Sequence, residues 1–262
     1  MGTVSLEFAH LSRRLKDLTG FDLHQYKPDQ MERRTRQWMA RRGVSSMAAL
    51  VRLLDQDPRA RTDLINHLTI STSQFFRDPS VFAALRDRVL PELLALGQTL
   101  EIWSAGCSIG AEPYSLAILL DRAGQSGRHH ILATDIDDDA LEQARAGRYH
   151  DLHLTNLPEE LRRRYFTPVG PGAWELAPSI RQAVNFRRHD LLKDPCRSGF
   201  HLILFRYVLI YLTPEAQQAV LMRLSQALAS GGYLVVGGPE HIPRPDALGL
   251  ERKEHCIYRR VR

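Results

Sequence analysis

Cysteine is scarce in this chain of 262 residues. The three cysteines, Cys107, Cys196 and Cys256, lie far apart in the sequence and are odd in number. A disulfide framework or a zinc site needs several cysteines at short, regular spacings. The spacing therefore predicts neither a disulfide scaffold nor a metal site. It favours a protein of the reducing cytoplasm.

Long apolar runs are also missing. A helix that crosses a membrane needs about 20 consecutive apolar residues. No run in the sequence approaches that length, although 44% of the residues are hydrophobic. Charged residues such as Glu7, Arg13 and Lys16 interrupt the first twenty positions, so we expect no signal peptide. The sequence predicts a soluble protein without membrane insertion, and we expect a monomer.

The charge is basic but carries no nucleic-acid signature. The chain has 35 Lys and Arg against 30 Asp and Glu, a formal net charge of +5. A positive surface suits an acidic partner, which can be nucleic acid or protein. Zinc-finger spacing, an aromatic RNA-binding motif and runs of five or more like charges are all missing. The charge does not choose between the two, and our expectation of an acidic protein partner without nucleic acid rests on the resemblance to a known family.

The chain is organised around a glycine turn. A short apolar run from Leu100 to Trp103 is followed by Gly106 and Gly110, and Pro113 then opens an apolar-periodic segment. This order predicts a strand, a turn and a helix. The glycine spacing differs from the dinucleotide motif G-x-G-x-x-G, and the lysine of a P-loop is missing. A nucleotide cradle and an ordinary tight turn both remain open on this evidence.

A second predicted strand, residues 130–135, ends in a carboxylate. Asp135 follows Gly110 by 25 residues. Ribose-binding α/β folds place an acid at about this distance, on the sugar hydroxyls. We expect Asp135 to fill that role, and we expect Asp137 or Asp138 to cap the following helix.

The first 60 residues predict a small basic helical module. Leucines recur at helical spacing before Gly20, and a second helix is expected from Met31 to Arg42. Five arginines lie in that second helix: Arg33, Arg34, Arg36, Arg41 and Arg42. They form either a solvated face or a dock for an acidic helix.

Residues 71–79 combine two aromatics with hydroxyls and an arginine. Phe75 and Phe76 are expected in the core. Arg77 is a candidate for holding a carboxylate, because a guanidinium grips that group in two places. The alternative is an ion pair between Arg77 and Asp78 or Glu112.

Strands and helices alternate over residues 99–262, which predicts a doubly wound α/β sheet. Residues 200–205 are nearly all apolar, as in a strand buried on both faces. Helices are expected over 80–96 and 216–228, the latter ended by Gly231 and Gly232, with final strands at 233–236 and 255–258. Residues 173–186 predict a hairpin excursion, and Asp190 follows as a candidate acceptor for an adenine amine or as a turn residue.

Several of these stretches, in order, resemble the CheR family, the chemotaxis-receptor glutamate methyltransferases that use S-adenosylmethionine. The resemblance covers nearly the whole chain. It is carried by Phe75-Phe76-Arg77-Asp78-Pro79, by residues 103–117 (WSAGCSIGAEPYSLA), by Ala133-Thr134-Asp135-Ile136-Asp137, by residues 144–149 (ARAGRY) and by Val208-Leu209-Ile210-Tyr211.

The resemblance implies a Rossmann-like class I methyltransferase sheet with two additions. An N-terminal all-α domain would span residues 1–70. The methyltransferase domain would span 71–262, with a small antiparallel β-subdomain inserted at about 150–184. Some members dock on a peptide at the receptor's C-terminus through a longer loop in that subdomain. The turn of residues 167–173 resembles the shorter version, so we predict no tethering peptide.

The resemblance also assigns the site. Arg77 and Tyr211 would be catalytic and no metal is implied. The residues implied to bind the cofactor are Ser71, Ser73, Arg77, Gly106, Gly110, Glu112, Asp135, Asp190, Leu191, Phe205 and Arg206. Glu112 and Asp135 would hold the ribose and neighbouring polar atoms. Asp190 and Leu191 would frame the adenine, whereas Ser71, Ser73 and Arg77 would flank the methionine part.

The chain departs from the family pattern at some of these places. The family typically has asparagine at positions 71, 190 and 207, where this chain has Ser71, Asp190 and Tyr207, and cysteine at 205, where it has Phe205. Gly238-Pro239-Glu240 also replaces the usual Gly-His-Ser-Glu pattern.

The implied activity is methylation of glutamate carboxylates on chemoreceptors, with S-adenosylhomocysteine as the other product. The acidic helical bundle of a receptor would suit the arginines of residues 33–42. Two alternatives stay open. The chain can be a cofactor-binding signalling module without methyl transfer, or it can methylate another substrate such as RNA, because a fold does not fix its substrate.

Overall fold

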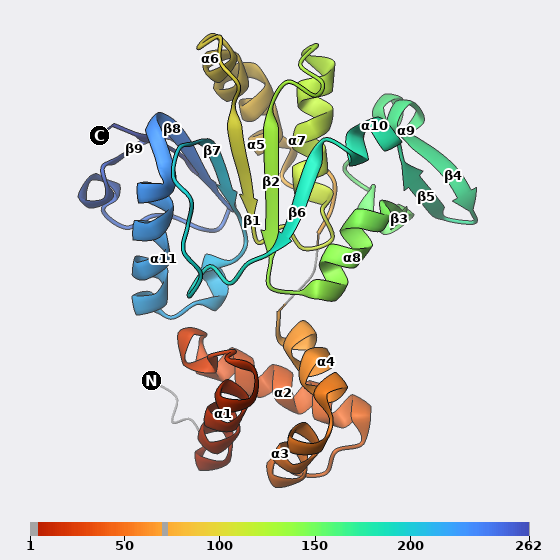
Figure 1. The fold of residues 1–262 in the computed structure, drawn as a ribbon, viewed down its shortest axis with the longest axis vertical. Coiled ribbons are helices and arrows are strands. Elements are labelled where there is room, and N and C mark those ends of the chain that lie inside the picture. The colour runs from red at the N-terminus through yellow and green to blue at the C-terminus, as the bar shows by residue number, and fades with distance from the viewer. Residues whose placement is uncertain (1–4, 70–72, 262) are drawn as a thin grey trace. The chain divides into compact units, whose positions relative to one another are not determined.

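The computed structural model describes residues 5–69 and 73–261. It divides into two compact units. The smaller unit is the described part of Met1–Ser71 together with Leu209–Gln218, and the larger is the described part of Thr72–Val208 together with Ala219–Arg262. Four α-helices within residues 5–69 form most of the smaller unit (Figure 1): α1 (Leu6–Thr19), α2 (Pro28–Arg42), α3 (Met47–Gln56) and α4 (Pro58–Leu68).

The helices of the smaller unit begin and end where the sequence places caps. Ser46 accepts a hydrogen bond from the Ala49 amide and starts α3, and Asp57 accepts one from the Arg59 amide and starts α4. Gly20 and Gly43 adopt left-handed backbone after α1 and α2, as the sequence predicts. One side of each helix is buried, which makes a separate apolar core.

Residues 209–218 complete this smaller unit. They contain a 3-10 turn, Leu209–Tyr211, and the start of α11 (Pro214–Ala227). The Lys27 amide donates to the Tyr211 carbonyl over 2.8 Å, and the Thr213 amide donates to the Gln25 carbonyl over 2.9 Å. Backbone hydrogen bonds therefore join residues 209–218 to the first helices of the chain.

The larger unit is built on a seven-stranded sheet within the described residues, in the order β6-β2-β1-β7-β8-β10-β9. The first five of these strands are parallel, and β10 and β9 are antiparallel. The strands are β1 (Glu101–Ala105), β2 (His130–Asp135), β6 (Val184–Arg188), β7 (Phe200–Phe205), β8 (Leu228–Val236), β9 (Leu250–Glu254) and β10 (Ile257–Arg260).

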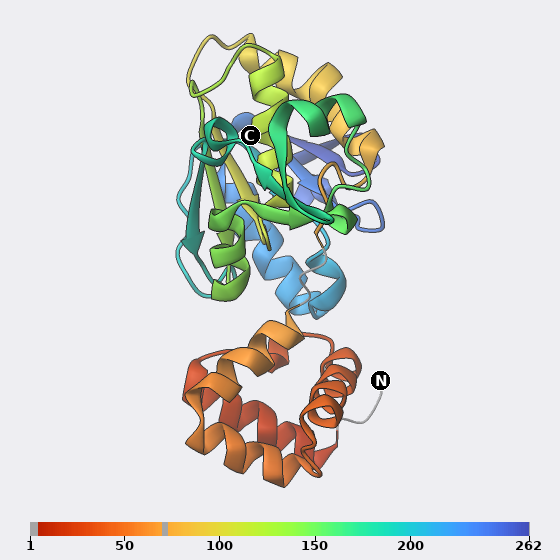
Figure 2. The same cartoon turned by 90° about the vertical axis from the view of Figure 1, so that its right-hand side faces the viewer.

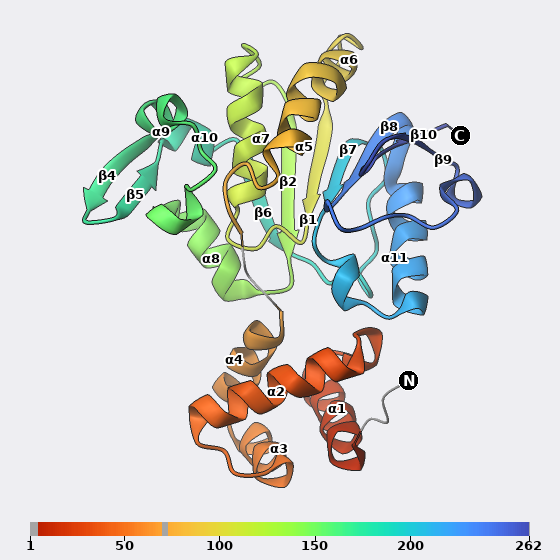
Figure 3. The same ribbon diagram turned by 180° about the vertical axis from the view of Figure 1, so that it is seen from behind.

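Helices cover one face of the strands β6, β2 and β1 and leave the other open. Figure 3 shows α5 (Pro79–Ala84) and α7 (Ala111–Arg122) across one face. Figure 1 shows the opposite face with no helix of the described chain in front of these strands. The remaining helices of this sheet are α6 (Leu90–Leu94), α8 (Asp138–Ala146) and α11. Among the described residues, no helix is both long and apolar enough to cross a bilayer.

A small antiparallel sheet interrupts the larger one, as expected. Its order is β3-β5-β4 (Figure 2), with β3 (Arg148–His150), β4 (Phe166–Gly170) and β5 (Ala173–Leu176). Two short helices, α9 (Glu159–Tyr165) and α10 (Pro178–Arg181), flank the β4–β5 hairpin. The expectation of an α/β methyltransferase-type sheet with an all-α N-terminal part and this insertion is confirmed.

Some local expectations were wrong. The helix expected over 80–96 is interrupted by a π-helical turn, Leu85–Val89, ahead of Pro91, because proline cannot donate an amide hydrogen bond to the preceding turn. The helix expected over 216–228 is present as α11, but Gly231 and Gly232 do not end it, because β8 starts at Leu228 and contains both glycines. The last strand begins at Ile257, and the sequence reading missed its antiparallel partner β9.

Candidate active site

The parallel strands bring the predicted site residues to one edge of the sheet. Because β6, β2, β1 and β7 are neighbours, their carboxyl ends lie together, and open α/β sheets bind ligands at such an edge. Asp135 ends β2, Gly106 follows β1, Arg206 follows β7, and Asp190 comes soon after β6. The His189 amide donates to the Asp135 carbonyl over 2.9 Å, which joins two of these ends.

The glycine turn has a structural reason for both glycines. Gly106 and Gly110 have φ of +79° and +83°. A Cβ on Gly106 would lie 2.9 Å from Val208 Cγ2, and one on Gly110 would lie 2.9 Å from Ala144 Cβ. Backbone conformation and packing therefore require glycine at both positions, whether the turn is a nucleotide cradle or an ordinary tight turn. Binding of a cofactor by these glycines stays a prediction.

Asp135 is held by backbone amides. Ser108 N donates to one carboxylate oxygen over 2.7 Å, and Asp137 N donates to the other over 3.0 Å. Burial raises the pKa of Asp135, and these amides act in the opposite direction. The Ile136 amide also acts in this direction, and a carboxylate offers about four acceptor positions, so Asp135 can still accept from a hydroxyl. Asp137 caps α8 through the Ala140 amide, as the sequence predicted.

Glu112 lies in the first turn of α7. One carboxylate oxygen accepts from Ser104 Oγ over 2.7 Å, and the other pairs with Arg206 over 3.1 Å. The helix N-terminus favours a negative charge here. Glu112 is therefore fixed on both sides and keeps lone pairs for a ligand.

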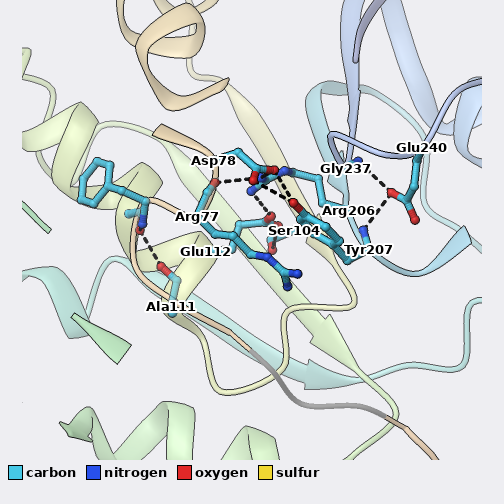
Figure 4. A network of polar contacts seen from close by, with 11 residues as sticks. Arg77, Asp78, Ser104, Ala111, Glu112, Arg206, Tyr207, Gly237 and Glu240 are labelled. Atoms are coloured by element: carbon cyan, nitrogen blue, oxygen red, sulfur yellow. Dashed lines mark hydrogen bonds and ion pairs between the residues drawn. The ribbon is translucent and has the colours of Figure 1, made fainter. Parts of the chain in front are cut away.

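Arg206 joins three elements at the centre of the site (Figure 4). One guanidinium nitrogen donates to the Arg77 carbonyl over 2.8 Å and to Asp78 over 2.7 Å, and another pairs with Glu112. Its side chain is 2% exposed. Burial lowers the pKa of Arg206, but the charges of Glu112 and Asp78 raise it further, so the guanidinium stays charged. Arg206 therefore braces the segment before α5 against α7.

Asp78 also contacts the hydroxyl of Tyr207, the residue that follows Arg206. The Tyr207 hydroxyl donates to the Asp78 carboxylate over 2.6 Å. Burial raises the pKa of Asp78, but the Tyr207 hydrogen bond and the Arg206 charge bring it below its ordinary value. The same burial and hydrogen bond raise the pKa of the Tyr207 phenol. The pair is therefore a neutral phenol donating to an ionised carboxylate.

The backbone of Tyr207 is strained and is held by Glu240. Tyr207 has φ of +62°, a conformation that is costly for a bulky side chain. The buried Glu240 carboxylate accepts from the Tyr207 amide over 2.8 Å and from the Gly237 amide over 2.7 Å. Sequence reasoning noted Gly238-Pro239-Glu240 as a departure but did not identify Glu240 as part of the site.

Arg77 lies over the Tyr207 ring, with its guanidinium carbon 3.3 Å from the ring centroid. The residues on either side of it, Phe76 and Asp78, have φ of +52° and +58°. Two departures from ordinary backbone within three residues mark a tightly constrained segment, as is common at functional sites. The ion pairs considered for Arg77, with Asp78 and Glu112, are made by Arg206.

The start of this segment is anchored through its aromatics. The Phe75 amide donates to the His153 carbonyl over 2.9 Å, and the Phe76 amide donates to Ser115 Oγ over the same distance. The Phe75 ring is fully buried against Tyr149. Ser73 is half-buried, and Ser71 lies outside the described residues.

The remaining predicted residues are spread over both units. Asp190 accepts from the Leu192 amide and pairs with Lys193, and Leu191 is half-buried beside it. The Phe205 ring is fully buried in β7. Tyr211 belongs to the smaller unit, where its carbonyl accepts from Lys27.

The arginines of α2 point in different directions within the smaller unit. Arg34 donates to the His67 carbonyl, Arg41 contacts the His67 ring, and Arg42 pairs with Asp63. Arg33 and Arg36 instead line an exposed hollow on α2 of about 520 Å³. The helix therefore presents a smaller basic face than its composition suggests.

The hydrogen-bond acceptors at the strand ends suit the hydroxyls and the amine of an adenosyl group. Asp135 and Glu112 offer acceptors at adjacent strand ends, beside a turn in which glycines keep the backbone open. Asp190 adds an acceptor at the end of β6. Such an arrangement suits ribose hydroxyls and an exocyclic amine.

Comparison with known proteins agrees with this geometry. Residues 71–256 match the family model described as CheR methyltransferase, SAM binding domain, and residues 6–69 match CheR methyltransferase, all-alpha domain. The chain is 35% identical over 253 residues to a chemotaxis protein methyltransferase of Listeria innocua, covering 96% of both chains. It is 33% identical over 252 residues to chemotaxis protein methyltransferase Cher2 of Pseudomonas putida, covering 92% of both. The chain therefore belongs to the CheR methyltransferase family, and its larger unit is the family's S-adenosylmethionine-binding domain.

Proposed function

We propose that this protein transfers a methyl group from S-adenosylmethionine to glutamate side chains of a chemoreceptor's cytoplasmic helical bundle, which gives glutamate γ-methyl esters. The observation that carries the proposal is the position of the Arg77 guanidinium, fixed over Tyr207 beside acceptors suited to a cofactor. The relatives named chemotaxis protein methyltransferases support the choice of substrate class.

Asp135 and Glu112 would hold the cofactor's ribose, with Asp190 and Leu191 near the adenine. When bound, S-adenosylmethionine supplies a methyl group on a positively charged sulfur, which is already activated for attack. A glutamate carboxylate has a pKa of about 4.3 and is ionised at neutral pH. The site therefore needs no strong general base.

Orientation is what the protein would contribute. Arg77 would hold the incoming carboxylate, since a guanidinium forms charge-assisted hydrogen bonds to that group. The stack on Tyr207 and the strained backbone on both sides limit where the guanidinium can go. Correct positioning of two reacting groups can lower the barrier by about 7–11 kcal/mol. Tyr211 is proposed to assist by a hydrogen bond to the substrate carboxylate.

The arginines of α2 are proposed to meet the acidic bundle. At the exposed hollow, Arg33 and Arg36 lie beside Asp29 and Glu32, and Arg36 pairs with Glu32 over 2.7 Å. We further propose that no tethering peptide is bound at the β4–β5 turn, and that the protein acts as a monomer in the cytoplasm.

The test is methyl transfer to purified receptor fragments. Labelled S-adenosylmethionine should give a label on the receptor that base releases as methanol. Arg77→Ala should nearly abolish transfer while the fold, checked by the urea unfolding midpoint, stays intact. Binding without transfer by the native chain, to any receptor tried, would favour a signalling module. A base-stable label would point to another substrate class.

A further inference from the structure

A large groove follows the open face of the sheet and continues around the edge of β6, and its lining runs from Glu101 and His130 to Thr134 and His189. Its volume is about 1070 Å³, and strands β1, β2 and β6 contribute to it. Trp103, Leu132 and Asn185 are register partners on these strands, so their side chains share this face. Parallel sheets are normally covered on both faces. This face therefore has the geometry of a helix-binding surface without its helix.

The floor of the groove is apolar. Leu132 is half-buried, and Trp103 packs against Phe200, with 5.1 Å between the ring centroids. The Trp103 indole donates to Thr134 Oγ1 over 2.9 Å, so its polar atom is already satisfied. Trp103 and Phe200 are only 2% and 1% exposed, so the apolar surface that the floor offers to a partner lies at half-buried side chains such as Leu132.

The rim is basic. Five arginines and one acid, Glu101, are among the described residues that line the groove. The arginines are Arg145, Arg181, Arg187, Arg188 and Arg197. Arg187 shares the open face with Asn185, whereas Arg145 on α8 approaches from the other side of β6, where Phe186 contacts Tyr114. Glu101 is already shared between His130 and Arg197.

Two of these arginines are available. The exposed Arg187 side chain has no hydrogen-bond or ion-pair partner among residues 5–69 and 73–261. The exposed Arg145 makes one hydrogen bond, to the Phe186 carbonyl over 3.2 Å. Arg181 and Arg188 pair weakly with Glu175 and Asp138, at 3.4 and 3.3 Å. The end of the groove near β6 therefore carries positive charge that local acids do not fully compensate.

We propose that this groove docks an amphipathic helix with acidic flanks, supplied by another protein. The sheet face fits a helix, the floor fits its apolar stripe, and the arginines fit its carboxylates. A helix about 10 Å across that filled this volume would be about 14 Å long, or about nine residues. The groove borders the candidate site at Thr134 and His189, but the docking uses none of the residues assigned to methyl transfer, so the inference does not depend on the proposed function.

A thiol in the groove gives a local readout. Cys196 lines it and is half-buried, whereas Cys107 and Cys256 are buried elsewhere. A bound helix should therefore slow alkylation of Cys196, and the two buried thiols serve as internal controls.

The probe is a synthetic helical peptide of about 15 residues, a length at which isolated helices become marginally stable. It has leucines on one face and glutamates on the other, and its twin has glutamines instead. Alkylation of Cys196 in the full-length protein is followed by mass spectrometry at low salt. The acidic peptide should slow the reaction at least fivefold, and the glutamine twin should not.

Charge reversal completes the test. Arg145→Glu with Arg187→Glu should abolish the protection, each rate being compared with the same variant without peptide. The matched control, Arg13→Glu with Arg52→Glu, changes two exposed arginines of the smaller unit. In this variant the acidic peptide should still slow alkylation of Cys196. The proposal is overturned if the native chain shows no protection, if the twin protects equally, or if the reversed variant is still protected. Stronger protection by a single-stranded oligonucleotide, or protection that rises with protein concentration alone, would also overturn it.

Discussion

The Arg77 guanidinium lies over the Tyr207 ring, with its central carbon 3.3 Å from the ring centroid. The ring is fixed in turn by the hydrogen bond from its hydroxyl to Asp78. Asp78 directly follows Arg77, so the two residues of one loop hold opposite parts of the same tyrosine. The loop and the tyrosine therefore orient each other.

Replacing Tyr207 by leucine should lower kcat/KM for methyl transfer about 5- to 30-fold, because a desolvated cation–π contact is worth about 1–2 kcal/mol. Tyr207→Phe keeps the ring and should lose less. Calorimetry with S-adenosylhomocysteine should show similar affinity for both variants. Equal activity of the leucine and phenylalanine variants would mean that the stack does not position Arg77.

Tyr207→Asn should move stability and activity in opposite directions. Asparagine tolerates the left-handed backbone better than tyrosine, and the strain relieved is about 1–2 kcal/mol. Loss of the hydrogen bond to Asp78 offsets part of that gain. We expect an unfolding midpoint at or above that of the native chain with kcat/KM reduced as in the leucine variant. A clear loss of stability would contradict this account of the backbone.

Arg206→Met should destabilise the larger unit by about 3–5 kcal/mol, because it leaves the half-buried carboxylates of Asp78 and Glu112 without the buried guanidinium that pairs with both. The matched control is Arg88→Ala, which removes an exposed ion pair with Glu254 and should cost at most about 1 kcal/mol. Urea denaturation of both variants measures the difference. Similar midpoints would show that Arg206 is not the brace inferred here.

Acidification should destabilise the protein from about pH 6.5 downward. Burial lowers the pKa of His67, His129, His153 and His189 below the ordinary value of 6.5. The unfolded chain therefore binds more protons than the folded one in this window, so stability rises with pH. Urea midpoints at pH 7.5, 6.5 and 5.5 should fall in that order.

His67→Gln tests this explanation, since the charges of Arg41 and Arg34 also disfavour protonation of His67. The variant should show a smaller fall between pH 6.5 and 5.5 than the native chain. The exposed His10 is the matched control, and His10→Gln should leave the pH dependence unchanged. An unaltered slope in the His67 variant would assign the effect to other groups.

Phe75→Ala should cost about 3–5 kcal/mol, the usual range for a buried phenylalanine. The ring packs edge-on against Tyr149 and Phe166, which belong to the small antiparallel sheet. Hydrogen exchange should therefore increase first over residues 148–176. Leu152→Ala, at a residue that is 62% exposed, is the control and should change little. Uniform loss of protection would show that Phe75 does not anchor this sheet.

The sequence was informative where local rules decide structure. Glycines in left-handed backbone ended α1 and α2, and Asp137 capped α8. Pattern and register also placed Asp135 and Gly106 at neighbouring strand ends. These features depend on a few consecutive residues or on strand alternation, which a sequence displays directly.

Features that depend on distant residues could not be predicted. Pairing of Arg206 with Asp78 and Glu112 joins residues more than 90 positions apart. The role of Glu240 depends on the strained backbone of Tyr207, which no propensity indicates. The open sheet face exists because no helix of the described chain covers it, and no sequence motif marks a missing helix.

Residues 209–218 have one more consequence, for dissection of the molecule. They pack with the first helices although they are encoded deep inside the larger unit. A fragment that begins at residue 73 would retain this segment but lose the backbone partners at Gln25 and Lys27. The two units therefore cannot be cloned apart by a single cut, nor exchanged as whole modules between homologues without a matching graft of this segment.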